Sequence, residues 1–228
     1  DTSRPMEQAD QEDRVRFAWL ARGLGKVMAA YIALVARTIR VSGPPINQGQ
    51  VIFAVWHETN LAAATAVWKL RDDKHPVVFS TRGYRGIVMN SMLRAFGSRV
   101  VTLPDEGAGT RREAAALTRT MARLARAGAS LVISCDGPFG PYRVAKPGVV
   151  IVARECGLPI QPWAMATRPP WRLKGRWDRM IVPLPFGRMR IYQGEPILVG
   201  ERDRLKPRLA ELQAGLDRVQ ALADQRMA

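Results

Sequence analysis

Apolar runs alternate along this chain with segments of helical periodicity, and this alternation restricts the fold more than any other feature of the sequence. Short runs rich in Val and Ile predict strands, and apolar residues three or four positions apart predict helices. The expected strands are 51–56, 77–80, 99–103, 131–134, 160–165, 180–182 and 189–192. The expected helices are 61–70, 86–96, 110–127, 148–156 and about 205–222. This βαβα order predicts an α/β fold with a mixed, largely parallel sheet flanked by helices.

The amino-terminal part of the chain differs from the rest. Residues 1–13 hold five acids and one arginine, which predicts a disordered tail. Residues 14–45 have apolar positions at helical spacing with interspersed basic residues, which predicts an N-terminal basic amphipathic helix. No secretory signal is visible at the start of the chain, where the residues are acidic rather than basic and apolar. Residues 46–228 are expected to form a single α/β domain.

The longest uncharged stretch of the predicted amphipathic helix is residues 27–36, which is ten residues. Roughly 20 apolar residues are needed to cross a bilayer. We therefore expect this helix to lie in a membrane interface, or alternatively to cover the protein core, but not to span a membrane.

The strong basic charge of the chain predicts an anionic partner. The 228 residues include 35 Lys and Arg against 20 Asp and Glu, for a formal net charge of +15 and a pI near 11.0. Nucleic acid, anionic lipid and phosphate-bearing metabolites all meet that description. The basic stretches lack interleaved aromatic residues and a known nucleic-acid motif, so nucleic acid is the least expected of the three.

The cysteines and histidines do not predict a metal site. Cys135 and Cys156 belong to no CxxC pair, and too few cysteines are present for a disulfide framework. The segment from His57 begins like a zinc-protease motif but has Leu61 where the second histidine should stand.

Polar residues follow three of the expected strands at their carboxyl ends. They are Trp56-His57, Ser80-Thr81-Arg82 and Cys135-Asp136-Gly137. In open α/β sheets ligands bind outside the carboxyl ends of the strands. We therefore expect these three groups to converge on one ligand site.

His57 is the expected general base of this site. It lies between a strand and a helical segment, where the helix dipole disfavours the imidazolium and keeps the ring able to accept a proton. His75 lies before Pro76 in a charged loop and is a weaker candidate. A thiol nucleophile at Cys135, activated by His57, is an alternative, although Cys135 continues an apolar strand and is more simply a buried residue.

The loop 136–143 combines an acid, two glycines, two prolines and an arginine. Proline restricts φ and glycine permits close backbone approach, so the loop is expected to be stiff and to let Asp136, Arg143 and Lys146 face one anionic group. A tight surface turn is the simpler alternative.

A second cationic group is predicted at the start of the helix 110–127. Thr110 and Glu113 form a capping box that places Arg111 and Arg112 in the first turn. Because cations oppose the dipole there, the two arginines are either solvated or bind an anion beside free backbone N–H groups, and we expect the anion. Arg82, Arg85 and Arg143 are expected to converge on the same area.

Several motifs together resemble the lysophospholipid acyltransferase superfamily, and more narrowly a bacterial branch with an Asp-Gly-Pro loop. They are Trp56-His57, Asp136-Gly137-Pro138-x-Gly140-Pro141-x-Arg143, Lys146-Pro147-Gly148, Gly157-x-Pro159-Ile160-x-Pro162, Trp177-Asp178-Arg179-x-Ile181-x-Pro183-x-Pro185-Phe186 and Gly194-Glu195-Pro196-Ile197. The similarity extends from about Val51 to Val199.

The resemblance implies a glycerol-3-phosphate acyltransferase-like fold and transfer of a fatty acyl group from acyl-coenzyme A or acyl-carrier protein to a hydroxyl of a lysolipid acceptor. His57 matches the catalytic base of the superfamily, and Arg111 or Arg112 matches the arginine of the acceptor-phosphate region. Gly137, Pro138 and Arg143 are expected to contact phosphate or donor. No cofactor is implied, and the expected location is the cytoplasmic face of the inner membrane, as a peripheral protein on an anionic surface.

One position departs from that pattern. Better-known members have an acid five residues after the histidine, which orients the imidazole, and here that position is Ala62. Loss of such a carboxylate costs related histidine systems several powers of ten in rate. Glu58, Thr59, Asn60 or Asp136 is expected to substitute. The alternative is a catalytically degenerate lipid-binding protein of the same fold.

Overall fold

A computed structural model describes residues 3–45, 49–70, 76–80, 83–102, 111–137 and 139–227, without the side chains of residues 3–16 and 111–114. It confirms the α/β class, with a seven-stranded sheet of order β1-β7-β6-β2-β5-β3-β4. In chain order the elements are α1 (Ser3–Thr38), β1 (Arg40–Ser42), β2 (Ile52–Val55), the 3-10 helix η1 (His57–Thr59), α2 (Asn60–Lys69), β3 (Val77–Ser80), α3 (Gly83–Ala95), β4 (Arg99–Thr102), α4 (Arg111–Arg126), β5 (Leu131–Ser134), α5 (Gly148–Cys156), β6 (Ile160–Arg168), β7 (Arg188–Gln193) and α6 (Leu205–Met227). Of the six described pairings between strands, only that of β6 with β7 is antiparallel.

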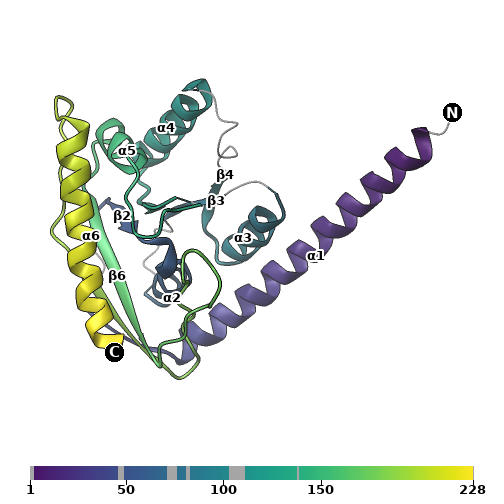
Figure 1. Ribbon diagram of the computed structural model, residues 1–228, viewed down its shortest axis with the longest axis horizontal. Coiled ribbons are helices and arrows are strands. Elements are labelled where there is room, and N and C mark those ends of the chain that lie inside the picture. Colours follow the sequence, from purple (N-terminus) through teal and green to yellow (C-terminus); the bar gives the residue numbers. More distant parts are fainter. Residues whose placement is uncertain are drawn as a thin grey trace.

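Helices cover both faces of the sheet and give the molecule three layers (Figure 1). On one face, Ile52 and Ala54 of β2 pack with apolar residues of α4, α5 and α6. On the other face, Phe53 and Val55 of the same strand pack with residues of α1 and α2. Successive residues of a strand point to opposite faces, so one strand contributes to both cores. The buried sheet therefore forms a rigid platform for residues at its carboxyl end.

The structure differs from the expected elements at two places. Residues 180–182 form no strand, and Ile181 makes only an isolated bridge to Arg172. The backbone N–H of Ile181 instead donates to the carbonyl of Glu58 at 2.7 Å, so this segment is held as a loop beside the end of β2. β1, which the sequence did not predict, is a three-residue strand that extends the sheet beyond β7.

The long helix α1 begins at Ser3, within the segment expected to be a disordered tail, and extends away from the body of the protein (Figure 1). It crosses α3 closely at Gly25. A Cβ atom there would lie 2.5 Å from the Cβ of Ser91 and 2.5 Å from the carbonyl oxygen of Val88. The hydroxyl of Ser91 donates to the carbonyl of Arg22 at 2.9 Å. Glycine is therefore required where the two helices meet.

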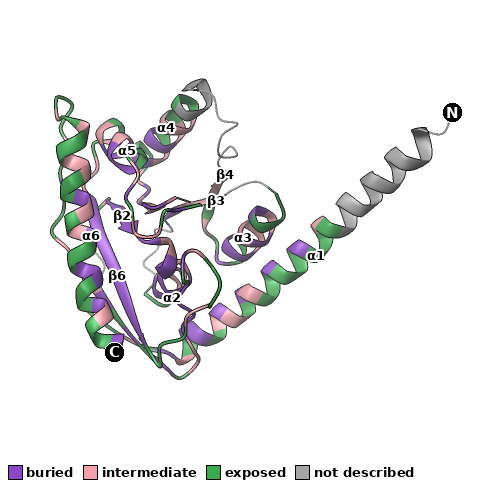
Figure 2. Ribbon diagram, in the orientation of Figure 1, coloured by how far each residue is buried: buried purple, intermediate pink, exposed green. Residues whose placement is uncertain are grey.

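Several apolar side chains of α1 are exposed (Figure 2), including Phe17, Trp19 and Val27, the second of them 72% exposed. From the sequence, the longest uncharged stretch of this helix is too short to span a membrane. The stretch Phe17–Thr38 is, however, 22 residues long with a mean hydropathy of 1.3, which meets a length and composition criterion for crossing. A core helix and a signal sequence meet the same criterion, so this is weak evidence for a membrane span.

Candidate active site

A cavity of about 1150 Å³ lies at the carboxyl ends of β3 and β5. Most of its lining is apolar and comes from α1, α2 and α3 on one side of the sheet and from α4 and α5 on the other. The polar residues that line it include His57, Asn60, Ser80, Arg85, Arg119, Ser134, Lys146, Glu155 and Arg176. The cavity is therefore a mostly hydrophobic space with a small number of polar groups, the usual character of a ligand site.

The register of the strands explains why a cavity forms at this place. β5 pairs with β2 at four positions, as far as Val55 with Ser134. Its pairing with β3 extends over two positions, Val77 with Leu131 and Val78 with Val132. β3 and β5 therefore separate towards their carboxyl ends, and the last residues of both strands line the cavity.

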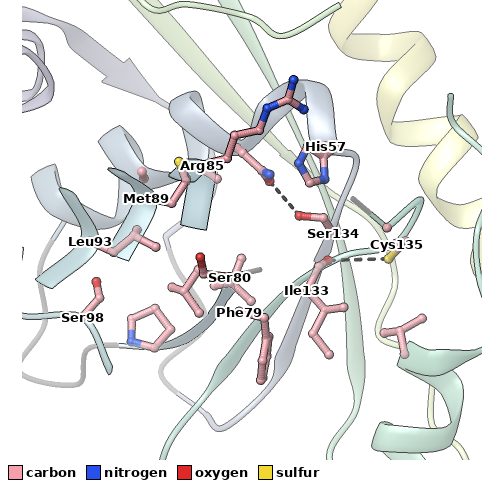
Figure 3. Close-up of a pocket in the computed structure, with 18 of the residues that line it drawn as sticks. His57, Phe79, Ser80, Arg85, Met89, Leu93, Ser98, Ile133, Ser134 and Cys135 are labelled. Carbon is pink, nitrogen blue, oxygen red and sulfur yellow. Dashed lines mark hydrogen bonds between the residues drawn. The ribbon is translucent and has the colours of Figure 1, made fainter. Parts of the chain in front are cut away.

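Figure 3 shows the arrangement inside the cavity. His57, Ser134 and Cys135 lie at one end, and Leu93 and Ser98 lie at the opposite end. One residue from each of the three polar groups that follow strands, namely His57, Ser80 and Cys135, lines this cavity.

His57 begins η1 directly after β2, and its position is fixed through its backbone. Its N–H donates to Oδ1 of Asp136 at 2.9 Å. The imidazole ring lies 5.4 Å from the indole of Trp177, centroid to centroid, with the planes tilted by 44°. The imidazole Nδ1 is buried and has no hydrogen-bond partner among the described residues. His57 therefore presents a histidine ring that is held in place by packing rather than by an acid bonded to it.

Burial lowers the pKa of His57 below its ordinary value. The negative charge of Asp178 acts in the opposite direction, and the positive charge of Arg176 lowers the pKa further. The imidazole is consequently neutral at pH 7, which is the protonation state that a general base requires.

The loop that follows β5 has the stiff conformation that the sequence predicts. Gly137 and Gly140 have φ values of +67° and +76°, a region that favours glycine. A Cβ at Gly137 would lie 2.9 Å from Nζ of Lys146, and a Cβ at Gly140 would lie 2.9 Å from the Trp177 ring. Both glycines thus allow neighbouring side chains to approach, and Gly137 and Lys146 line the cavity as predicted residues of the site.

Asp136 is fully buried, and its carboxylate accepts hydrogen bonds from backbone N–H groups rather than from the imidazole. Its Oδ1 accepts the His57 N–H, and its Oδ2 accepts the N–H of Arg143 at 3.4 Å. Burial raises the pKa of Asp136 to about 6, against the opposing effect of these backbone hydrogen bonds. The structure therefore places Asp136 as a support of the His57 backbone, whereas the sequence analysis considered it an orienter of the ring.

Arg143 lies in an ion-pair network instead of in the cavity. Its Nε donates to Glu58 at 2.6 Å, and its guanidinium also donates to Asp224 at 2.7 Å. Arg172 pairs with the same two acids, and the hydroxyl of Tyr142 donates to Glu58 at 2.9 Å. Glu58 is buried, and a buried carboxylate is costly unless it is paired. Arg143 and Arg172 provide the positive charges that neutralise it. The structure does not bring Arg143 together with Lys146 on one anion.

The other residues suggested as substitutes for the missing acid are also engaged. The hydroxyl of Thr59 donates to the carbonyl of Trp56 at 2.9 Å. Asn60 Oδ1 accepts the hydroxyl of Ser134 at 2.9 Å. Ala62 is buried in the core between α2 and the sheet, in the cluster that contains Phe53 and Trp163.

Some predicted site residues cannot be placed. Arg82, Pro138 and Thr110 lie outside the described residues, as does His75. Arg111 and Arg112 begin α4, but their side chains are outside the description. Their proposed contacts with a phosphate stay predictions.

Cys135 does not have the properties of a nucleophile. Its side chain is buried, and burial raises the pKa of the thiol well above its ordinary range. A reactive cysteine requires a lowered pKa, because the thiolate is the nucleophile. Cys135 therefore serves as an apolar lining residue of the cavity.

Arg85 was expected at this site, whereas Arg176 and Asp178 are charged groups near His57 that the sequence did not indicate. Arg85 belongs to α3 and its side chain extends toward the His57 end of the cavity in Figure 3. Arg176 lines the cavity, and Asp178 acts on His57 by charge. The Trp177-Asp178-Arg179 motif was the available signal, but its distance from His57 along the chain hid their proximity.

The fold and the site define a three-layer α/β protein with a histidine at the end of an apolar cavity. No family model and no solved structure matches the chain. The chain is similar to an uncharacterized protein of Rickettsia prowazekii (strain Madrid E), with 28% identity over 152 residues, which is 67% of this chain and 66% of the relative. The matched region thus covers somewhat less than two thirds of that relative's length.

Proposed function

We propose that this chain is an acyltransferase that moves a fatty acyl group from an acyl-coenzyme A or acyl-carrier-protein thioester to a hydroxyl of a lysophospholipid or related lipid. The observation that carries the proposal is the position of a neutral, half-buried His57 at one end of a largely apolar cavity of about 1150 Å³. A cavity of this kind suits a hydrocarbon chain, and the histidine suits a group that must lose a proton.

The proposed reaction uses His57 as general base. The unprotonated imidazole nitrogen takes the proton of the acceptor hydroxyl while that oxygen forms a bond to the thioester carbonyl carbon. The resulting tetrahedral intermediate collapses with cleavage of the carbon–sulfur bond. The imidazolium then gives its proton to the leaving sulfur, so the products are an ester and a free thiol and His57 is again neutral.

Basic residues at the cavity support an anionic substrate. Arg85 and Arg176 are exposed and line the same cavity as His57. Guanidinium groups pair well with phosphate oxygens, which both an acyl donor of this class and a phospholipid acceptor carry. We assign Arg85 to contact with the phosphate of one substrate.

The proposal includes the glycerol-3-phosphate acyltransferase-like variant of the α/β fold and a peripheral position on the cytoplasmic face of the inner membrane. Leu24 and Met28 of α1 line the cavity, while Phe17, Trp19 and Leu20 of the same helix are exposed. A helix of this kind lying in an anionic membrane surface would bring the cavity close to its lipid substrate.

The proposal is tested by incubating the purified protein with labelled acyl-coenzyme A or acyl-carrier protein and a panel of lysolipids. We expect a labelled diacyl product, and we expect His57→Gln to lose at least about 100-fold in turnover. His75→Gln is the matched control and should retain activity. Equal activity of wild type and His57→Gln would contradict the base role.

A catalytically degenerate lipid-binding protein is the second proposal. It is favoured by Ala62 and by the lack of an acid bonded to the His57 ring within the described part of the chain. Saturable binding of fatty acid or lysolipid without turnover of any acyl donor would support it. Measured acyl transfer that depends on His57 would exclude it.

A further inference from the structure

The His57 ring lacks the usual carboxylate, and the residues nearest in sequence do not replace it. Position 62 is a buried alanine, and Glu58 is neutralised by Arg143 and Arg172. Asp136 accepts the backbone N–H of His57 rather than the imidazole N–H. A negative charge for the imidazolium must therefore come from elsewhere in the fold.

Asp178 has the placement that this role requires. It is fully buried, and it immediately follows Trp177, whose indole lies 5.4 Å from the His57 ring. Its Oδ1 accepts Nε of Arg176 at 2.9 Å and the N–H of Met180 at 3.3 Å, and its Oδ2 accepts a second guanidinium nitrogen at 2.7 Å. The carboxylate is thus fixed in orientation on the residue that follows the aromatic neighbour of His57.

The segment that carries Asp178 is tied to the backbone next to His57. The N–H of Ile181 donates to the carbonyl of Glu58 at 2.7 Å. At its other side, Trp177 packs against Gly140, which has no Cβ to displace it. The first contact ties the segment to η1 and the second ties it to the loop after β5, so Asp178 lies in a segment that is held on both sides.

We propose that Asp178 is the charge partner of His57 and stabilises its imidazolium through space, without a hydrogen bond to the ring, in place of the carboxylate that Ala62 does not supply. This inference rests on the proposed role of His57 as general base. Asp178 is set apart from the acids engaged elsewhere because its carboxylate is buried next to the residue that packs on the imidazole.

Arg176 limits the effect of Asp178. Its guanidinium forms two hydrogen bonds with the carboxylate, so the pair adds little net charge to the cavity. The other charged groups that line this region are Arg85 from α3 and Lys146 after β5, with Asp136 behind the His57 backbone. Asp178 has the larger effect of the two on the His57 pKa, so the pair on balance favours the imidazolium, whereas burial keeps the imidazole neutral before reaction.

The inference is tested by NMR titration of the imidazole resonances, which requires no substrate. The chain has two histidines, so His57→Gln assigns the signals and His75 serves as an internal reference. We expect Asp178→Asn to lower the pKa of His57 by roughly 0.5–1 pH unit and Arg176→Gln to raise it by a similar amount. The double variant is expected to return it close to the wild-type value.

Asp178→Asn keeps the oxygen that accepts the Met180 N–H, so a purely structural role predicts no movement of the His57 pKa. Asp203, which pairs with Arg208 at 2.8 Å far along the chain, supplies the matched control Asp203→Asn. A His57 pKa that is unchanged in Asp178→Asn, or that moves in the same direction in Asp178→Asn and Arg176→Gln, would overturn the inference. Thermal unfolding of each variant verifies that the titration reports folded protein.

This experiment separates the inference from the proposed function. Opposite pKa shifts without any acyl transfer would leave Asp178 as the charge partner of His57 and remove the acyltransferase. If acyl transfer is found, Asp178→Asn is expected to reduce turnover by about 10- to 100-fold with little change in KM. Acyl transfer with an unmoved His57 pKa in the variant would remove only the role of Asp178.

Discussion

The carboxylate of Asp136 accepts the backbone N–H of His57 at 2.9 Å and joins the loop after β5 to the start of η1. The two residues are 79 positions apart in sequence, but β2 and β5 are neighbouring parallel strands, so their carboxyl ends meet. The other oxygen of the same carboxylate accepts the N–H of Arg143. Asp136 therefore fixes the shape of the Gly137–Arg143 loop and the position of the histidine together.

Asp136→Ala is expected to lower the free energy of unfolding by about 2–3 kcal/mol, because it leaves two backbone N–H groups without their acceptor. Asp136→Asn retains an oxygen for the His57 N–H and is expected to remain within about 1 kcal/mol of wild type at pH 7. Urea unfolding monitored by tryptophan fluorescence measures both. Equal losses in the two variants would contradict the backbone role.

The pH dependence gives a second test of the same site. The pKa of Asp136 is raised to about 6 in the folded protein, so the folded state binds more protons than the unfolded state between pH 4 and 6. Its contribution to stability is therefore present at low pH and is lost as the pH rises through that range. As the pH rises from 4 to 7, we expect the free energy of unfolding of Asp136→Asn to increase relative to that of wild type by up to roughly 3 kcal/mol.

The rate of acyl transfer is expected to depend on pH through His57. Burial lowers its pKa, so the neutral base predominates down to a pH below the ordinary value of 6.5. The logarithm of kcat/KM should therefore rise with pH and level off with a midpoint below 6.5. The folded state also binds fewer protons there than the unfolded state, so stability decreases as the pH falls below 6.5. A midpoint above 6.5 would contradict a base whose pKa is lowered by partial burial.

Arg143→Ala is expected to destabilise the protein by about 2–4 kcal/mol, because it removes one partner of the buried Glu58 carboxylate. It should leave the affinity for a fluorescent fatty acid unchanged, since Arg143 lies in the network with Asp224 and not in the cavity lining. Arg204→Ala, at an exposed position, is the control and should shift stability by less than about 0.5 kcal/mol. A loss of ligand affinity with intact stability would restore the phosphate contact that the sequence suggested.

The sequence was sufficient for the α/β class and for the place of the site. Continuous apolar runs and helical patterns identified β2, β3, β5 and their following helices, because a strand covered by helices on both faces is apolar at successive positions. The rule that ligands gather at the carboxyl ends of parallel strands then located His57, Ser80 and Cys135 correctly. The loop 136–143 was predictable for the same local reason, since its glycines must adopt positive φ.

The roles of individual charges were not predictable. Arg143 contacts Asp224, which lies 81 residues further along the chain, and no local pattern records that pair. Residues 180–182 resemble a strand in composition. In the structure they form a loop, in which the N–H of Ile181 donates to the carbonyl of Glu58 and the N–H of Val182 donates to the carbonyl of Trp171. Such contacts depend on packing between distant segments, which the local alternation of apolar residues does not specify.

The exposed apolar residues of α1 are expected to bind anionic vesicles. Trp19→Ser should reduce partition into vesicles containing phosphatidylglycerol by about 10-fold or more, because it removes a large exposed aromatic side chain from the proposed interface. Leu198→Ser, which alters another exposed apolar residue outside α1, should have little effect. Vesicle cosedimentation measures both variants. Equal partition of Trp19→Ser and wild type would contradict membrane contact through this part of α1.

The crossing of α1 over α3 provides a matched pair of glycines on one helix. Gly25→Ala should destabilise the protein by about 1–3 kcal/mol, because its Cβ would meet Ser91 and the carbonyl of Val88 at 2.5 Å. Gly23→Ala has no atom within 4 Å of the added carbon and should stabilise α1 by up to about 1 kcal/mol through helix propensity. Urea unfolding compares the two. Because Leu24 lines the cavity, Gly25→Ala should also weaken binding of a fluorescent fatty acid, whereas Gly23→Ala should not. Effects of equal sign in the two variants would show that α1 does not pack on α3 in this way.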